Sequence, residues 1–153
     1  MNGAITMLLV DDHAGEVRTV LSGSVRVGVA DSIAFLTPDL AGHLAVTGSH
    51  GGASAGEYAR RLGVAAVACN DAGIGKDSAG IAGLAALDAD GIVGVAVGHD
   101  TARIGDGTDA WESGIVSYAN ASALAAGVRP GQPLRTAFTE LAARWAREGA
   151  TAC

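Results

Sequence analysis

The sequence has 153 residues, which fits one α/β domain, 1–153, and is too short for a second independent core. Hydrophobic residues make up 49% of it, aromatic residues only 4%, and 23 residues are glycine, so small aliphatic side chains and closely packed backbones must form the core. The formal net charge is −6, and Lys and Arg do not cluster, which argues against a nucleic-acid partner.

The apolar runs argue against a membrane protein. The longest of them, such as 92–97, fall far short of the roughly 20 residues that a membrane-spanning helix needs. The start of the chain has no basic flank before its short apolar run, so it does not resemble a signal peptide. Cys69 and Cys153 do not suggest a disulfide framework. We therefore expect a cytoplasmic protein, with Cys69 as a small buried core residue.

In the first part of the chain, short apolar runs predict strands. Residues 4–10 form one such run, residues 17–30 alternate as in a hairpin, and residues 32–36 form a further strand that Pro38 ends. We expect this part to supply an N-terminal hairpin or antiparallel extension of the main sheet.

From residue 44 onward, strand, glycine-rich loop and helix follow one another. Runs that are apolar throughout are typical of parallel strands buried on both faces, and they occur at 43–49, 64–70 and 92–98. Helical spacing between these runs predicts helices at 53–63, with Gly63 as the C-terminal cap, and at 78–91. This order predicts a Rossmann-like, three-layer α/β fold in which helices flank a mostly parallel central sheet.

The C-terminal part of the chain is predicted to be helical. One helix is expected at 113–127, and a second, amphipathic helix at about 134–148. Its apolar stripe has spacings of four, three and four residues and consists of Leu134, Phe138, Leu141 and Trp145. This stripe is expected to cover the sheet or to pack against a second copy of the chain, so we expect a homo-oligomer.

Polar, glycine-rich loops follow the three strands predicted after residue 44. Because the carboxyl ends of parallel strands meet at one edge of a sheet, these loops are expected to share a pocket there. The first loop contains Ser49, His50, Gly51 and Gly52; the second contains Asn70, Asp71, Gly73, Gly75, Lys76 and Asp77; the third contains His99, Asp100, Arg103 and Asp106.

Two kinds of role are assigned to these residues. The catalytic candidates move protons or orient a group that does so, and are expected within about 10 Å of one another: His50, Asp71, Lys76 and His99. The substrate-binding candidates offer backbone N–H groups or polar side chains to an anion: Ser49, Gly51, Gly52, Asn70, Gly73, Gly75, Asp77, Asp100, Arg103 and Asp106.

Each assignment has a structural alternative. Lys76 can be a solvated lysine paired with Asp77. Either Asp77 or Ser78 would cap the helix predicted after them, and Lys76 would then lie just outside the N-terminus of that helix. His99 can be a structural histidine held by hydrogen bonds, and Asp106 can simply form a turn with the glycine that follows it.

Known catalytic and nucleotide-binding motifs are incomplete. In the second loop Asn70 replaces the first glycine of a phosphate loop and Asp77 follows Lys76, so no nucleotide cofactor is expected. Thr47 replaces the first glycine of a nucleophile elbow, and Ser49 and His50, as neighbours on an extended chain, point to opposite sides. The histidines lack the spacing of a metal-binding motif, so no metal is expected.

These observations favour an enzyme of the hydrolase, lyase or isomerase type that acts on a small anionic or carbonyl-containing metabolite. Two alternatives remain open. One is a ligand-binding or regulatory module that has the same pocket without chemistry, and the other is a structural subunit of an oligomer. A catalyst needs at least one base with a perturbed pKa, whereas a binding site needs only complementary charge.

Overall fold

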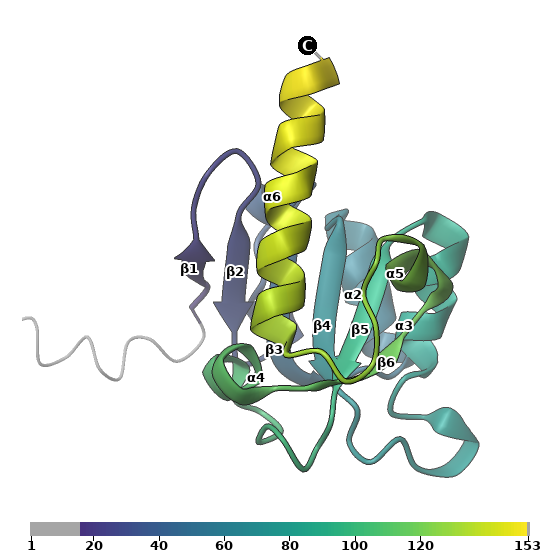
Figure 1. Ribbon diagram of the computed structural model, residues 1–153. Coiled ribbons are helices and arrows are strands. Elements are labelled where there is room, and N and C mark those ends of the chain that lie inside the picture. Colours follow the sequence, from purple (N-terminus) through teal and green to yellow (C-terminus); the bar gives the residue numbers. More distant parts are fainter. Residues whose placement is uncertain (1–15, 153) are drawn as a thin grey trace, which may run out of the picture.

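Six strands form one sheet in the computed structural model, which describes residues 16–152 (Figure 1). Their order in the sheet follows the chain: β1 (Arg18–Leu21), β2 (Val27–Ala30), β3 (Leu44–His50), β4 (Ala66–Asn70), β5 (Val93–Val97) and β6 (Val116–Ala119). Strands β2 to β5 are parallel, whereas β1 and β6 are antiparallel at the two edges. The predicted mostly parallel sheet with an N-terminal hairpin is therefore confirmed, and the strand predicted at 4–10 lies outside the described residues.

Helices cover both faces of the sheet, which gives the α/β fold its layers. Since crossovers between neighbouring parallel strands are right-handed, successive connections in this order lie on the same face. That face carries η1 (Ile33–Phe35), η2 (Pro38–Leu40), α2 (Ala53–Leu62), α3 (Ala82–Ala86) and η4 (Leu87–Asp90), and η3 (Lys76–Ser78) lies in the exposed loop before α3. The opposite face carries α4 (Gly107–Ser113) and α6 (Leu134–Ala152), and α5 (Ala121–Ala125) lies beside β5 and β6 (Figure 1).

The apolar pattern of the sequence accounts for both layers of the core. All residues of β4 and β5 are buried, as their unbroken apolar runs predicted, and so are all residues of β2, which was predicted as part of the hairpin. On α6, Leu134, Phe138 and Leu141 are buried against the sheet, and Trp145 packs beside them, so the predicted stripe faces the sheet. Helix α2 ends at Gly63, which adopts the left-handed conformation expected of a C-terminal cap. Between residues 16 and 152, the helices lack the length and apolar character that crossing a membrane requires.

Two predicted elements are wrong. Residues 32–36 do not form a strand, because Ser32 caps the turn η1 by accepting the N–H of Ala34. Residues 113–127 are not one helix, because Val116–Ala119 pair with β5 as β6, and the helices on either side are α4, which ends at Ser113, and Ala121–Ala125. The first difference comes from a local side-chain cap that the sequence already contained, and the second from a tertiary contact, the pairing with β5.

The predicted helix at 78–91 also starts later than expected. Asp77 and Ser78 have φ values of +56° and +57°, so neither residue caps a helix, and α3 begins only at Ala82. Lys76 therefore lies in the exposed turn η3 and not directly before the first turn of α3.

A buried asparagine joins β5, β6 and the two helices beside them. Asn120 is 1% exposed, and its Nδ2 donates to the carbonyl oxygens of Leu84 (2.9 Å) and Ile92 (3.0 Å). Its Oδ1 accepts the N–H groups of Ala123 (2.9 Å) and Gly94 (3.1 Å). This side chain therefore satisfies four backbone groups that water does not reach.

We expect Asn120→Ala to lower the free energy of unfolding by about 3 kcal/mol or more, because each buried group left without a partner costs about 1–3 kcal/mol. Urea denaturation followed by circular dichroism measures the change. Glu140→Ala, at an exposed position of α6, is the control and should change the free energy by less than about 0.5 kcal/mol. A loss below about 1 kcal/mol for Asn120→Ala would contradict this role.

Candidate active site

The carboxyl ends of β3, β4 and β5 meet at one edge of the sheet and bring the three polar loops together. His50 on β3 is paired with Asn70 on β4, and Asn70 is paired with Val97 on β5. Neighbouring strands lie about 4.8 Å apart, so side chains that follow these three strands are close in space. The edge therefore has the arrangement on which the predicted pocket depends.

The third loop, residues 98–106, runs back along this edge from β5 to β3. Asn70 Nδ2 donates to the carbonyl oxygen of Ala102 (3.0 Å), and Gly105 N donates to the carbonyl oxygen of Gly48 (2.7 Å). A Cβ atom at Gly48 would collide with the backbone of Gly105 and Asp106. The loop can follow this course only because residue 48 has no side chain.

Asp71 and His99 form a hydrogen-bonded pair at the centre of the edge. The Asp71 Oδ1 accepts the backbone N–H of Gly73 (2.7 Å) and of His99 (3.1 Å), and lies 3.3 Å from His99 Nδ1. Its Oδ2 accepts the hydroxyl of Ser117 (2.6 Å) from β6. The side chain of Asp71 is 7% exposed and that of His99 is 60% exposed, so a buried carboxylate holds an imidazole that solvent and small molecules can reach.

The hydrogen bonds around Asp71 fix its charge. Burial alone would raise the pKa of this carboxyl, but the hydrogen bonds from Ser117, Gly73 and His99 together outweigh burial and lower the pKa below its usual range. An ionised carboxylate can only accept hydrogen bonds, so the proton of neutral His99 must be on Nδ1. The lone pair of Nε2 is then left for a substrate.

Most of the predicted glycine N–H groups are already bonded within the chain. Gly51 N donates to the carbonyl oxygen of Asn70, Gly73 N to Asp71, and Gly75 N to the carbonyl oxygen of Gly73. At Gly52 no side chain caps α2. These three bonded N–H groups hold the loops in place, which is a structural use of the glycines.

The polar side chains of the loops divide in a similar way. Asp106 caps α4 by accepting the N–H of Asp109, a structural role that differs from the turn considered for it. Lys76, Asp77, Asp100 and Arg103 are exposed. The side chains of Lys76 and Arg103 make no hydrogen bond or ion pair with any residue between 16 and 152, so both cations are free to meet a ligand.

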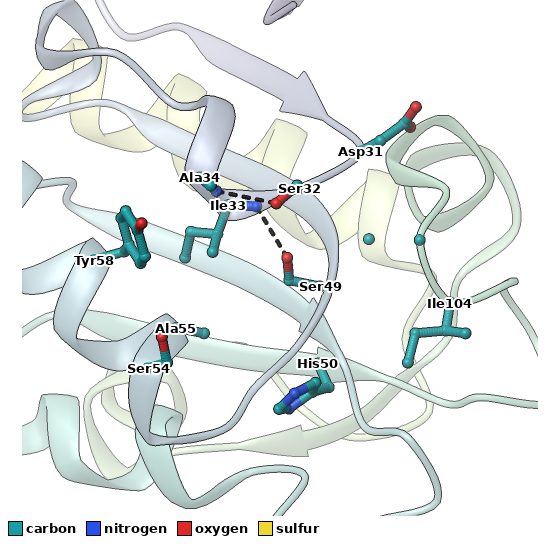
Figure 2. Close-up of a pocket in the computed structure, with 12 residues that line it drawn as sticks. Asp31, Ser32, Ile33, Ala34, Ser49, His50, Ser54, Ala55, Tyr58 and Ile104 are labelled. Carbon is teal, nitrogen blue, oxygen red and sulfur yellow. Dashed lines mark hydrogen bonds between the residues drawn. The ribbon is translucent and has the colours of Figure 1, made fainter. Parts of the chain in front are cut away.

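A cavity of about 460 Å³ lies on the same edge, between the ends of β2 and β3 and the start of α2 (Figure 2). Ser49 and His50 line it from β3, Tyr58 from α2, and Ile104 from the third loop. Ser49 Oγ accepts the backbone N–H of Ile33 (2.9 Å) at its floor. The cavity is therefore a neighbour of the Asp71–His99 pair, but it is not lined by either residue of that pair.

Sequence reasoning missed three of these residues. Ser117 was overlooked because its segment was predicted to be helical, although the alternation of "IVSYA" was a signal for a strand. Tyr58 and Ile104 lie in a helix and a loop and have no local signal for a pocket.

Cys69 is fully buried, as predicted, and burial raises the pKa of its thiol to about 11.

Among residues 16–152, no three His, Cys, Asp or Glu side chains come together as a metal-binding group.

Comparison with known proteins gives no assignment: no protein-family model matches the chain, and neither a curated protein nor a solved structure shows a significant match. The site must therefore be interpreted from its own chemistry.

We expect the stabilising effect of the Asp71 carboxylate to depend on pH. A group whose pKa is lowered in the folded state stabilises the fold above its ordinary pKa, here 3.8, and loses this effect as the pH falls through the lowered value. Asp71→Asn keeps the shape of the side chain but cannot ionise. The difference in free energy of unfolding between the native chain and Asp71→Asn should therefore be constant near neutral pH and should shrink below about pH 4.

Urea denaturation at a series of pH values measures this difference. Asp77→Asn, an exposed aspartate in the same loop, controls for the loss of one negative charge. A difference that stays constant or grows as the pH falls would contradict the lowered pKa of Asp71.

Proposed function

We propose that this chain is an enzyme that moves a proton on a small anionic or carbonyl-containing metabolite, with His99 as the proton-transferring residue. One observation carries the proposal: the buried carboxylate of Asp71 lies 3.3 Å from Nδ1 of an exposed imidazole. A purely structural histidine has no need of an exposed Nε2 at a strand end. The same arrangement of carboxylate and imidazole serves general acid and base catalysis in many unrelated enzymes.

The steps follow from the charges of the pair. Neutral His99 takes a proton from the substrate on Nε2 and becomes an imidazolium, and the negative charge of Asp71 stabilises this cation. Ser117 and the backbone N–H groups keep Asp71 ionised, so Asp71 orients the ring without taking the proton. The proton is then returned to another atom of the substrate or to its leaving group. Isomerase, lyase and hydrolase reactions all include such a transfer.

The free cations near this edge suit the anionic end of the substrate. Arg103 presents a planar fork of donors that matches a carboxylate, and Lys76 presents a mobile point charge. His50, at the end of β3, is a third donor close to the pair. These three side chains are the proposed binding groups, and Asp100 and Asp77 are carboxylates that can balance their charge. The proposal includes no nucleotide cofactor.

A second candidate function is a ligand-binding module without chemistry. It is favoured by the separation of the cavity from the Asp71–His99 pair, since a binding module needs only the cavity. Catalytic proton transfer distinguishes the two functions, because a binding module has none.

The cytoplasmic location and the homo-oligomer stay predictions, and sedimentation equilibrium measures the subunit number.

The proposed proton transfer can be followed by NMR in D₂O. We expect the protein to speed the exchange of hydrogen for deuterium next to the carbonyl group of small 2-oxo acids such as phenylpyruvate, or to hydrolyse small esters such as 4-nitrophenyl acetate. In the exchange, Nε2 removes a proton, loses it to the solvent and returns a deuteron. His99→Gln should lower the rate about a hundredfold or more, because a positioned base contributes about that factor.

Asp71→Asn should also lower the rate, since it no longer forces the proton of His99 onto Nδ1. His43→Gln is the control and should leave the rate unchanged. His43 lies just before β3, at the amino ends of the parallel strands, whereas His99 lies at their carboxyl ends. The proposal fails if neither exchange nor hydrolysis exceeds the rate in buffer, or if His99→Gln keeps the full rate.

A further inference from the structure

The cavity between β2 and β3 has the size and position of a small-molecule site. Its volume of about 460 Å³ falls within the range of about 300–1,000 Å³ that is typical of ligand pockets. Four separate segments form its wall: the turn after β2, the end of β3, the first turns of α2, and the third loop (Figure 2). Such a wall is set by the fold as a whole and not by one mobile segment.

Apolar side chains dominate one part of the wall. Ile33, Ala55, the Tyr58 ring and Ile104 all face the cavity. Ile104 is 52% exposed and is one of the three large hydrophobic side chains that are most exposed between residues 16 and 149, so the cavity offers open apolar surface to a ligand.

Hydrogen-bond donors occupy another part. Ser49 Oγ accepts the N–H of Ile33, which leaves the hydroxyl hydrogen of Ser49 to donate to a ligand. The Ser54 hydroxyl and the His50 ring lie at the lower side of the cavity in Figure 2. The carboxylate of Asp31 points away from them toward the start of α4, where its Oδ1 accepts the N–H of Gly107 (3.0 Å).

From these contacts we infer that the cavity holds the apolar body of the substrate, a small molecule with a ring or branched chain and one oxygen-acceptor end, either carboxylate or carbonyl. The statement that this ligand is a substrate rests on the proposed function. The binding of the ligand in the cavity does not depend on that function. The body covers Ile104 and Tyr58, and the oxygen end accepts hydrogen bonds from Ser49, Ser54 or His50.

The position of His50 connects the cavity with the Asp71–His99 pair. In the order of the sheet the cavity lies at the ends of β2 and β3, and the pair at the ends of β4 and β5. His50, at the end of β3, lies between them and is about two strand spacings, or about 10 Å, from the end of β5. The third loop carries His99 at its start and Ile104 near its end, so one segment contributes to both.

Binding can be measured without knowledge of the natural substrate. The probe is phenylacetate, which has a ring and a carboxylate but nothing for His99 to react with. In two-dimensional ¹H–¹⁵N NMR spectra of the full chain we expect saturable shifts at Tyr58, Ser54 and Ile104. Acetate, which lacks the ring, should not produce these shifts at the same concentrations. Phenylacetamide tests whether a neutral carbonyl end is bound as well as the carboxylate.

A pair of matched variants tests the apolar contact. Ile104→Ser should weaken binding of phenylacetate about tenfold, which is the loss expected when about two buried methyl groups are removed from a contact. Leu124→Ser removes a comparably exposed leucine from α5, 41% exposed, and should leave the affinity unchanged. Both positions are largely exposed, so both variants are expected to fold, and their NMR spectra verify this.

The outcomes separate this inference from the proposed function. His99→Gln should bind phenylacetate as the native chain does, although it lacks the proton-transfer activity. The inference is overturned if phenylacetate gives no saturable shifts, if the shifts map away from the cavity, or if Ile104→Ser and Leu124→Ser behave alike. In each of these cases a loss of exchange activity in His99→Gln would still support the proposed function.

Discussion

Burial of the parallel strands on both faces constrains everything else in this fold. Strands β2 to β5 are covered by α2 and α3 on one side and by α4 and α6 on the other, so neither face can hold a charged group that a ligand reaches. Polar chemistry is then confined to the ends of the strands. Because these strands are parallel, their carboxyl ends, and the loops that follow them, share one edge.

The buried carboxylate of Asp71 shows how this edge is held together. Its two oxygens accept hydrogen bonds from the loop after β4, from the start of the loop after β5, and from β6. A buried charge with so many donors is stable only when all three segments are in place, so the fold and the charge support each other. The exposed imidazole of His99 is oriented by this arrangement without contributing to the core.

The loop of residues 98–106 gives the edge its second feature. It follows the ends of β5, β4 and β3 through hydrogen bonds to Asn70 and Gly48, so it joins the Asp71–His99 pair to the cavity beside β2. A substrate whose apolar body lies in the cavity and whose oxygen end points toward His50 would approach His99 along this loop. The proposed division into a binding part and a reacting part depends on the course of this one short segment.

Much of this architecture was determined by the sequence alone. Unbroken apolar runs predicted the parallel strands β3, β4 and β5, the stripe of Leu134, Phe138 and Leu141 predicted the side of α6 that faces the sheet, and polar residues after successive strands predicted a common edge. These features are local, since periodicity records which faces of a segment are buried.

The tertiary structure decided the rest. Pairing with β5 turned Val116–Ala119 into a strand and brought Ser117 to Asp71, 46 positions away in the chain. The cavity likewise needs four segments whose meeting depends on the order of the strands, and no single segment carries a signal for it.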